Sequence, residues 1–212
     1  MCHANVIVLI TPQYPGESNH ANLWKQPYAL PNGKVGRSAR EAVRKMLAPY
    51  GYSTRERGAW PAGVVHCIGW DGYWIGGSWG GQFDPQYDVM KDPRNQQRCT
   101  GCMGTGWTFV FGKPAASQSG SKKVCGLCHG TGRCAKSADE RTPVDGDIAP
   151  VAMLPEKLDA YAVITPDGIW HECGEWFGEV LHEPGVEGWE AKIKRLLEQH
   201  RDAVAVNVDI HF

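Results

Sequence analysis

Two copies of one eight-residue pattern, Cys-x-x-Cys-x-Gly-x-Gly, occupy residues 99–106 and 125–132. A Cys-x-x-Cys pair places two thiolates at the ends of a tight turn, where they can hold one edge of a tetrahedral Zn²⁺ site. The glycines that follow let the backbone fold closely around a metal, where a Cβ would obstruct a positive φ angle. Two copies complete a four-sulfur shell and predict one structural zinc ion. The predicted ligands are Cys99, Cys102, Cys125 and Cys128.

The same four cysteines have two other interpretations, a pair of disulfides or four free thiols. Two Cys-x-x-Cys pairs in glycine-rich turns favour zinc over both. A closed four-sulfur site leaves no coordination position for a substrate, so we assign the metal to folding and not to chemistry. The remaining four cysteines have no evident pairing pattern, which is typical of a reducing cytoplasm.

This repeat resembles the cysteine-rich zinc module of the DnaJ chaperone family. In that family four repeats bind two zinc ions, so the resemblance implies a single ion for the two repeats of this chain. The His-Pro-Asp motif of a J domain does not occur in the sequence. The resemblance therefore implies a zinc module and not a co-chaperone.

Cys2 is the candidate catalytic nucleophile. Removal of the initiator methionine would leave a free α-amine beside its thiol, the arrangement of N-terminal-nucleophile hydrolases and amidotransferases. Those enzymes have a four-layer αββα fold with glycine-rich strands after the nucleophile, and the sequence does not indicate that architecture. A terminal cysteine without a role is the alternative.

Several histidines and cysteines near predicted strand ends form a second candidate cluster. They could converge on another metal or on an acid–base site, although none has Cys-x-x-Cys or His-x-x-x-His spacing. Strand-end histidines are more often structural residues with satisfied hydrogen bonds. No serine-hydrolase, zinc-protease or dinucleotide-binding motif occurs, so the sequence makes no strong case for an enzyme. The cluster comprises His3, His66, Cys67, His171, Glu172, Cys173 and His211.

Residues 70–83 combine five aromatic residues with five glycines. One interpretation is a binding groove for a planar or peptide ligand. The other is an aromatic core packed under a glycine-rich turn, which we favour because aromatic side chains mostly fill cores. The candidate binding residues in this stretch are Trp70, Tyr73, Trp74 and Trp79.

The net charge of −1 hides an uneven distribution along the chain. Residues 91–141 carry nine Lys and Arg against three Asp and Glu, whereas residues 142–212 carry five against fourteen. A basic segment around the zinc site suits an acidic protein surface or nucleic-acid phosphates, and the acidic segment could mimic nucleic acid. Trp107, Lys122 and Lys123 are the candidate binding residues of the predicted hairpin at 107–124. Nucleic-acid contacts would also involve Arg94, Arg98, Lys113, Arg133 and Lys136.

Outside the cysteine repeats, the two ends of the chain have similar patterns. Apolar runs at 6–10 and 160–164 are each followed by Thr-Pro and predict strands buried on both faces. Residues 64–68 predict a second strand, and the alternating pattern at 204–212 predicts an edge strand. Amphipathic helices with apolar residues at i, i+4, i+7 and i+8 follow both buried strands. Their apolar positions are Ala39, Val43, Met46 and Leu47, with a capping box at Ser38 and Glu41, and Trp189, Ile193, Leu196 and Leu197.

We therefore predict an α+β, ferredoxin-like scaffold of two pseudo-duplicated β-α-β halves, with an inserted zinc-knuckle β-hairpin module. The first half spans 1–94, the insertion 95–135, a linker 136–150 and the second half 151–212. The longest aliphatic run, Val6–Ile10, is too short to cross a bilayer, and no signal-peptide pattern is present. We expect no membrane association and a cytoplasmic location, and the oligomeric state stays open.

The whole layout is similar to that of a poorly characterised family of accessory proteins encoded by tailed bacteriophages. The matching features are the Met-Cys-His-Ala start, Trp74–Trp79, the two cysteine repeats, 165–171 and the valine-rich C-terminus. This resemblance implies a phage protein that acts in the host cytoplasm. The leading hypothesis is a zinc-stabilised, non-catalytic protein that binds a host protein to inhibit a defence system or redirect an enzyme. The alternatives are a nucleic-acid-binding protein and a hydrolase or amidotransferase that uses Cys2.

Overall fold

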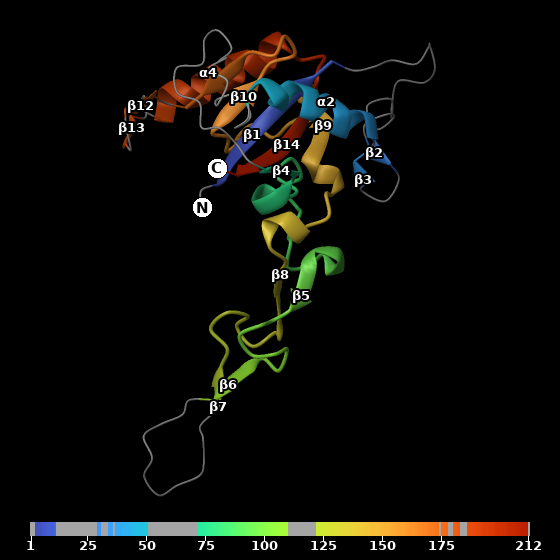
Figure 1. Ribbon diagram of the computed structural model, residues 1–212, viewed down its shortest axis with the longest axis vertical. Helices are drawn as coiled ribbons and strands as arrows, with labels where there is room; N and C mark the ends of the chain where they lie inside the picture. The colour runs from blue at the N-terminus through green and yellow to red at the C-terminus, as the bar shows by residue number, and fades with distance from the viewer. Residues whose placement is uncertain are drawn as a thin grey trace, which may run out of the picture. The chain divides into compact units, whose positions relative to one another are not determined.

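The computed structural model describes residues 3–11, 29–30, 34–35, 37–50, 72–109, 122–173, 175–177, 180–182 and 186–211 of the 212-residue chain. The chain forms two compact units, and Figure 1 labels most of their helices and strands. The sheet unit comprises Met1–Tyr87 and Thr142–Phe212. The knuckle unit comprises Asp88–Arg141.

A mixed sheet with the strand order β11-β10-β1-β14-β4 forms the centre of the sheet unit. β1 is parallel to β10 and antiparallel to β14. On its other side, β14 pairs with β4 near its C-terminal end and with β9 near its N-terminal end. The strands are β1 (His3–Ile10), β4 (Gly72–Ile75), β9 (Ile148–Pro150), β10 (Ala162–Ile164), β11 (Trp170–Glu172) and β14 (Val204–His211).

Helix α2 (Arg37–Leu47) covers the face of the sheet that carries the even-numbered residues of β1. Its fully buried residues share a core with Val6 and Val8, and their spacing of four places them on one side of the helix. The helix begins one residue before the predicted cap at Ser38 and ends, as predicted, before Pro49. The buried residues of α2 are Ala39, Val43 and Leu47.

Helix α4 (Val186–Gln199) covers part of the opposite face. Trp189, Ile193 and Leu196 pack there against Ile7 and Leu9 of β1. The indole N–H of Trp189 also donates to the backbone oxygen of Ala160, at 2.6 Å. The apolar positions predicted for this helix are therefore its buried positions, apart from the half-buried Leu197.

The other half of that face is polar. Asn5, Asn207 and Asp209 point from β1 and β14 to this side and are at most 2% exposed. The segment after β4, residues 76–82, covers them with its backbone and with Gln82. The polar side of β14 is thus covered by a segment of the same unit.

The α+β class is confirmed, because the sheet is mixed and few helices accompany it. The prediction that residues 204–212 form an edge strand is wrong, because β14 is paired along both sides and buried on both faces. The ferredoxin-like pseudo-duplication is not confirmed, since α2 and α4 pack on opposite faces of the sheet. The strand predicted at 64–68 lies outside the described residues.

Two short antiparallel ladders frame the knuckle unit. β5 (Gln96–Arg98) pairs with β8 (Arg133–Ala135), and β6 (Trp107–Phe109) pairs with β7 (Lys122–Val124). The β6–β7 ladder agrees with the predicted hairpin, whose tip lies outside the described residues. Two further ladders in the sheet unit pair β2 (Ala29–Leu30) with β3 (Lys34–Val35) and β12 (Glu175–Phe177) with β13 (Val180–His182).

Within the described ranges, neither helix combines the length and the apolar character that a bilayer crossing requires.

Candidate metal centre

The four cysteines of the two repeats meet in the interior of the knuckle unit. Their sulfur atoms all lie within 4.8 Å of one another, and each residue is at most 6% exposed. The Sγ atoms of Cys99 and Cys125 are 3.8 Å apart, and those of Cys102 and Cys128 are 3.6 Å apart. A disulfide needs about 2 Å. Tetrahedral Zn–S bonds of about 2.3 Å give sulfur–sulfur separations of roughly 3.8 Å, so the four thiols fit one zinc ion.

The first knuckle, between β5 and β6, is a tight turn in which a backbone amide donates to a cysteine sulfur. The N–H of Gly104 donates to Cys99 O at 3.0 Å, and the N–H of Gly106 donates to Cys102 Sγ at 3.2 Å. The Thr105 hydroxyl donates to Cys102 O at 2.7 Å and fixes the turn. A thiolate at Cys102 therefore accepts a hydrogen bond that favours its charged form.

The second knuckle, between β7 and β8, repeats this arrangement. The N–H of Gly132 donates to Cys128 Sγ at 3.3 Å, and the Thr131 hydroxyl donates to Cys128 O at 2.7 Å. The N–H of His129 donates to Cys125 O at 2.8 Å. The shared Cys-x-x-Cys-x-Gly-Thr-Gly pattern thus folds into a similar turn twice.

The two knuckles also close each other across a local pseudo-twofold axis. Cys99 N–H donates to Gly132 O, and Cys125 N–H donates to Gly106 O, both at 2.9 Å. A Cβ on Gly106 would lie 2.3 Å from Gly130 O, and one on Gly132 would lie 2.4 Å from Gly104 O. Both positions also have φ angles of at least +71°. Only glycine allows the two turns to approach this closely.

The cysteines differ in how the surrounding groups shift their pKa. Burial raises the pKa of the Cys99 thiol to about 12. Burial also acts upward on Cys102, but the Gly106 amide and the neighbouring thiols outweigh it and lower its pKa to about 6. Burial also acts upward on Cys128, but the Gly132 and Gly130 amides together with Cys125 outweigh it and lower the pKa. A Zn²⁺ ion adds two positive charges and would hold all four sulfurs as thiolates.

Cys134 is a fifth cysteine beside the centre that the sequence analysis left without a role. It is half-buried on β8 and packs against the four-cysteine cluster. It is not among the residues whose sulfur atoms converge. Its position two residues after the second repeat is the signal that could have placed it near the metal.

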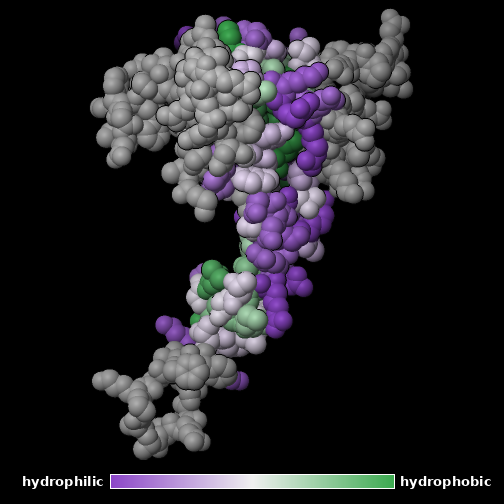
Figure 2. Space-filling view, viewed as in Figure 1, coloured by the Kyte–Doolittle hydropathy of each residue, from purple (hydrophilic) through white to green (hydrophobic). Residues whose placement is uncertain are grey.

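The ladders on the two sides of the centre carry different side chains at equivalent positions. Trp107 stands opposite Val124 in the β6–β7 ladder, and both are 46% exposed. At the equivalent places of the other ladder, Arg98 stands opposite Arg133. The predicted binding residues Lys122 and Lys123 are also exposed. Figure 2 shows apolar and polar residues side by side on the visible face of this unit.

The aromatic and glycine-rich stretch has a backbone that packs against buried carboxylates. The N–H of Gly81 donates to Asp147 at 2.6 Å, and the N–H of Ser78 donates to Asp209 at 2.8 Å. A Cβ on Gly77 would lie 2.4 Å from the Asp209 Cβ, which explains a glycine at this place. Of the predicted binding residues, Tyr73, Trp74 and Trp79 are half-buried, and Trp70 lies outside the described residues.

The second predicted cluster is divided by the sheet order. His3 and His211 are opposite each other on β1 and β14. His171 and Glu172 lie on β11, two strands from β1, and Cys173 follows them. Burial and the nearby charge of Lys192 lower the pKa of His171. Cys2, His66 and Cys67 lie outside the described residues.

Comparisons of the chain with protein-family models, with curated proteins and with solved structures find no match.

Proposed function

We propose that this protein is a zinc-stabilised, non-catalytic binding protein whose knuckle unit docks on a partner protein. The observation that carries the proposal is the distribution of exposed large apolar side chains. Five of the seven such side chains in the described ranges belong to the 54 residues of the knuckle unit. They are Met90, Met103, Trp107, Val124 and Leu127.

The metal is the structural part of this proposal. Four buried sulfurs with tetrahedral spacing support one Zn²⁺ ion, and the repeated Cys-x-x-Cys-x-Gly-x-Gly turn supports a DnaJ-type zinc module. A closed four-sulfur shell has no open position, so the ion stabilises the fold of the unit that presents the docking residues. We expect one zinc per chain at this centre by elemental analysis, and the loss of that ion in the Cys99→Ser variant.

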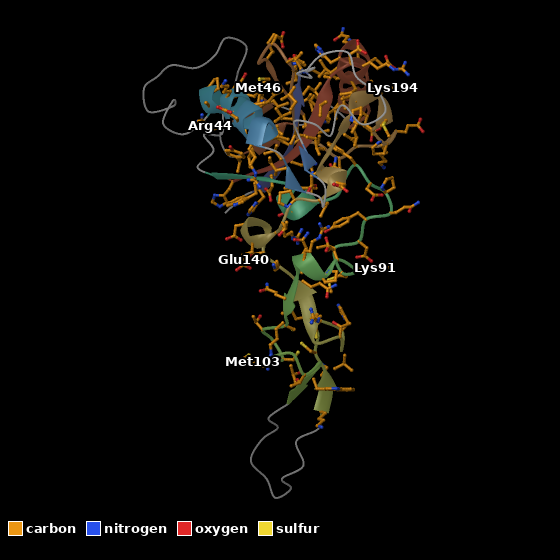
Figure 3. The ribbon with its side chains drawn as sticks, turned by 90° about the vertical axis from the view of Figure 1, so that its right-hand side faces the viewer. Arg44, Met46, Lys91, Met103, Glu140 and Lys194 are labelled. Atoms are coloured by element: carbon orange, nitrogen blue, oxygen red, sulfur yellow. The ribbon has the colours of Figure 1, made fainter. Side chains whose placement is uncertain are left out.

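The docking surface consists of Trp107, Val124, Leu127 and Met103. Trp107 and Val124 are cross-strand neighbours, and Leu127 and Met103 lie on the two knuckles, where they are 58% and 63% exposed. Figure 3 labels Met103. Three of the four side chains are aliphatic or thioether groups, which pack in protein interfaces but do not stack on bases. This composition supports a protein partner.

Charge indicates the chemistry of that partner. The knuckle unit has nine basic and four acidic residues, and Lys122 and Lys123 are next to the docking surface in sequence. Charge complementarity across an interface then requires an acidic partner surface. The resemblance to phage accessory proteins makes a host cytoplasmic protein the expected partner.

Nucleic acid is the second candidate, and the Arg98–Arg133 pair favours it. Two guanidinium groups opposite each other on β5 and β8 could contact successive phosphates, with Lys122 and Lys123 as further contacts. Such binding would weaken steeply as salt rises, whereas an interface with an apolar centre would be less sensitive.

The test is affinity purification of the tagged protein from host lysate, with and without nuclease, followed by mass spectrometry. We expect one nuclease-resistant protein at stoichiometric level, lost with Trp107→Ala combined with Leu127→Ala. Met153→Ala is the matched control, because Met153 is 67% exposed in the sheet unit. A partner that survives the double substitution, or that disappears with nuclease, would contradict docking at this surface.

A further inference from the structure

A second group of chemistry-bearing side chains lies in the sheet unit, on the polar half of the sheet. They lie in two neighbouring sets of directly opposed residues on adjacent strands. His3 stands opposite His211, and Asn5 stands opposite Asp209, which in turn stands opposite Trp74. Directly opposed residues and residues two apart on a strand share one face, so all five belong to the same face.

Asp209 fixes the orientation of His3. Its side chain is fully buried, and one carboxylate oxygen lies 2.9 Å from His3 Nδ1. The other oxygen accepts the N–H of Ser78, at 2.8 Å. With Nδ1 donating to the carboxylate, the lone pair of His3 is on Nε2, which has no hydrogen-bond partner among the residues the structure describes. The His3 side chain is 34% exposed.

The distance between the rings of His3 and His211 is compatible with a shared ion. The ring centroids of His3 and His211 are 5.1 Å apart. Two imidazoles bound to one ion through nitrogens at about 2.0–2.1 Å have centroids roughly 4.5–5.2 Å apart for bond angles between octahedral and tetrahedral.

A buried acceptor on the same face of the sheet as the two histidines lacks a donor. The Asn5 side chain is 2% exposed, and its amide nitrogen donates to Gln82 and to the backbone oxygen of Asp159. The amide oxygen Oδ1 therefore faces elsewhere, and it has no partner among the described residues. A water bound to an ion at the histidines would supply a donor of the kind this oxygen lacks.

An aromatic ring lies on the other side of His211. The residue opposite it on β4 is Gly72, which has no side chain. The indole of Trp74 lies beside this glycine, 3.4 Å from where a Cβ would stand, and its centroid is 6.2 Å from that of His211. An ion here would have the Trp74 ring on one side.

We propose that His3 and His211 bind one divalent transition-metal ion of the Zn²⁺, Ni²⁺ and Cu²⁺ class, with Asp209 as the carboxylate that orients His3. A carboxylate on the second ring nitrogen is the usual partner of a metal-bound histidine. Imidazole nitrogen suits these metals, and Mg²⁺ and Ca²⁺ prefer oxygen ligands. This site is independent of the four-cysteine centre, because its residues belong to the sheet unit.

The test uses the full-length, zinc-loaded protein and Ni²⁺ as the probe. We expect equilibrium dialysis to give one Ni²⁺ per chain beyond the structural zinc. His3→Gln and His211→Gln should each abolish this uptake, and Asp209→Asn should weaken it 10- to 100-fold. Paramagnetic broadening in NMR spectra should be confined to residues of the sheet unit around these histidines.

The control is His129→Gln, which removes an exposed histidine from the second knuckle. Uptake should be unchanged in this variant, and its loss would place the ion at the knuckles and overturn the proposal. No uptake by the wild-type protein, or equal uptake by His3→Gln and His211→Gln with unchanged circular dichroism, would also overturn it. Since Asp209 is buried, the two histidine variants decide the question if Asp209→Asn fails to fold.

Discussion

Gly106 and Gly132 occupy equivalent places in the two knuckles, and neither place accepts a side chain. Each has a positive φ angle and faces a backbone carbonyl of the other knuckle. Gly126 lies in the same repeat, but a Cβ there would meet nothing within 4 Å. The fold therefore requires glycine at particular positions of the repeat and not at every glycine of the segment.

Gly132→Ala should disrupt the knuckle unit, and Gly126→Ala should not. A Cβ at position 132 combines a left-handed backbone with overlap on Gly104 O, which should destabilise the unit by roughly 2–4 kcal/mol. The control substitution should stay within about 0.5 kcal/mol. The measurement is zinc release to a chromophoric chelator during denaturant titration. Equal release curves for the two variants would contradict this interpretation of the cross-knuckle contact.

Zinc affinity should fall as the pH is lowered. Backbone amides, with Gly106 and Gly132 foremost, and neighbouring thiols together outweigh burial and lower the pKa of Cys102, to about 6, and of Cys128. A group whose pKa is depressed in the folded state stabilises that state above its unfolded pKa, near 9 here, and this contribution is lost as pH falls through about 6. Protons then compete with the ion for the sulfurs. Chelator competition between pH 8 and 5 measures the effect, and a constant affinity over that range would contradict it.

At the scale of secondary-structure elements, local sequence patterns predicted the features that depend on residues close together in the chain. Apolar periodicity identified β1, β10 and the buried positions of both helices, and the cysteine repeat identified the ligands of the candidate centre. It did not place β14, because Asn207 and Asp209 on one side of the strand indicate a face in water. Their partners lie on residues 76–82, more than 120 positions earlier in the chain, and no local pattern reports such a contact.

Asp147 is the residue that holds this covering segment, and its loss should loosen the segment. Its buried carboxylate accepts the N–H of Gly81 and of Val144 and contacts the Asn207 amide. Asp147→Ala leaves two buried backbone donors without an acceptor, so we expect a loss of roughly 2–5 kcal/mol in unfolding free energy. Asp145→Ala, two positions earlier and exposed, is the control and should change little. Similar denaturation midpoints for both variants would show that Asp147 does not hold the segment.

At the scale of the whole molecule, the knuckle unit is an insertion with adjacent ends. In the sheet unit, Phe83 N–H donates to Gly146 O at 2.9 Å just outside the two junctions. In the knuckle unit, the first and last strands are the paired β5 and β8. Each unit thus closes its own end of the connection with hydrogen bonds. The two cysteine repeats in the sequence indicate an inserted module, but its boundaries depend on these long-range hydrogen bonds and strand pairs.

Replacing Asp88–Arg141 by a short Gly-Ser linker should leave the sheet unit folded. Its two cores contain no residue of the insertion, and the hydrogen bond between Phe83 and Gly146 keeps the junctions together. The expected product unfolds cooperatively, lacks the zinc of the four-cysteine centre and keeps the fluorescence of the buried Trp170 and Trp189. The complementary fragment of 88–141 should bind one zinc. A deletion variant without a cooperative transition would show that the sheet unit depends on the insertion.

The pseudo-twofold arrangement of the knuckles also bears on how such a module can originate. Each repeat supplies two sulfurs, and the Cys99 and Cys125 amides each donate to the glycine carbonyl of the other copy. One repeat therefore supplies half of the closed four-sulfur site. Two separate peptides that each carry one copy could assemble around a shared ion as a 2:1 complex. Duplication of such a peptide within one gene would then turn an association between molecules into an intramolecular fold, whose assembly no longer depends on concentration.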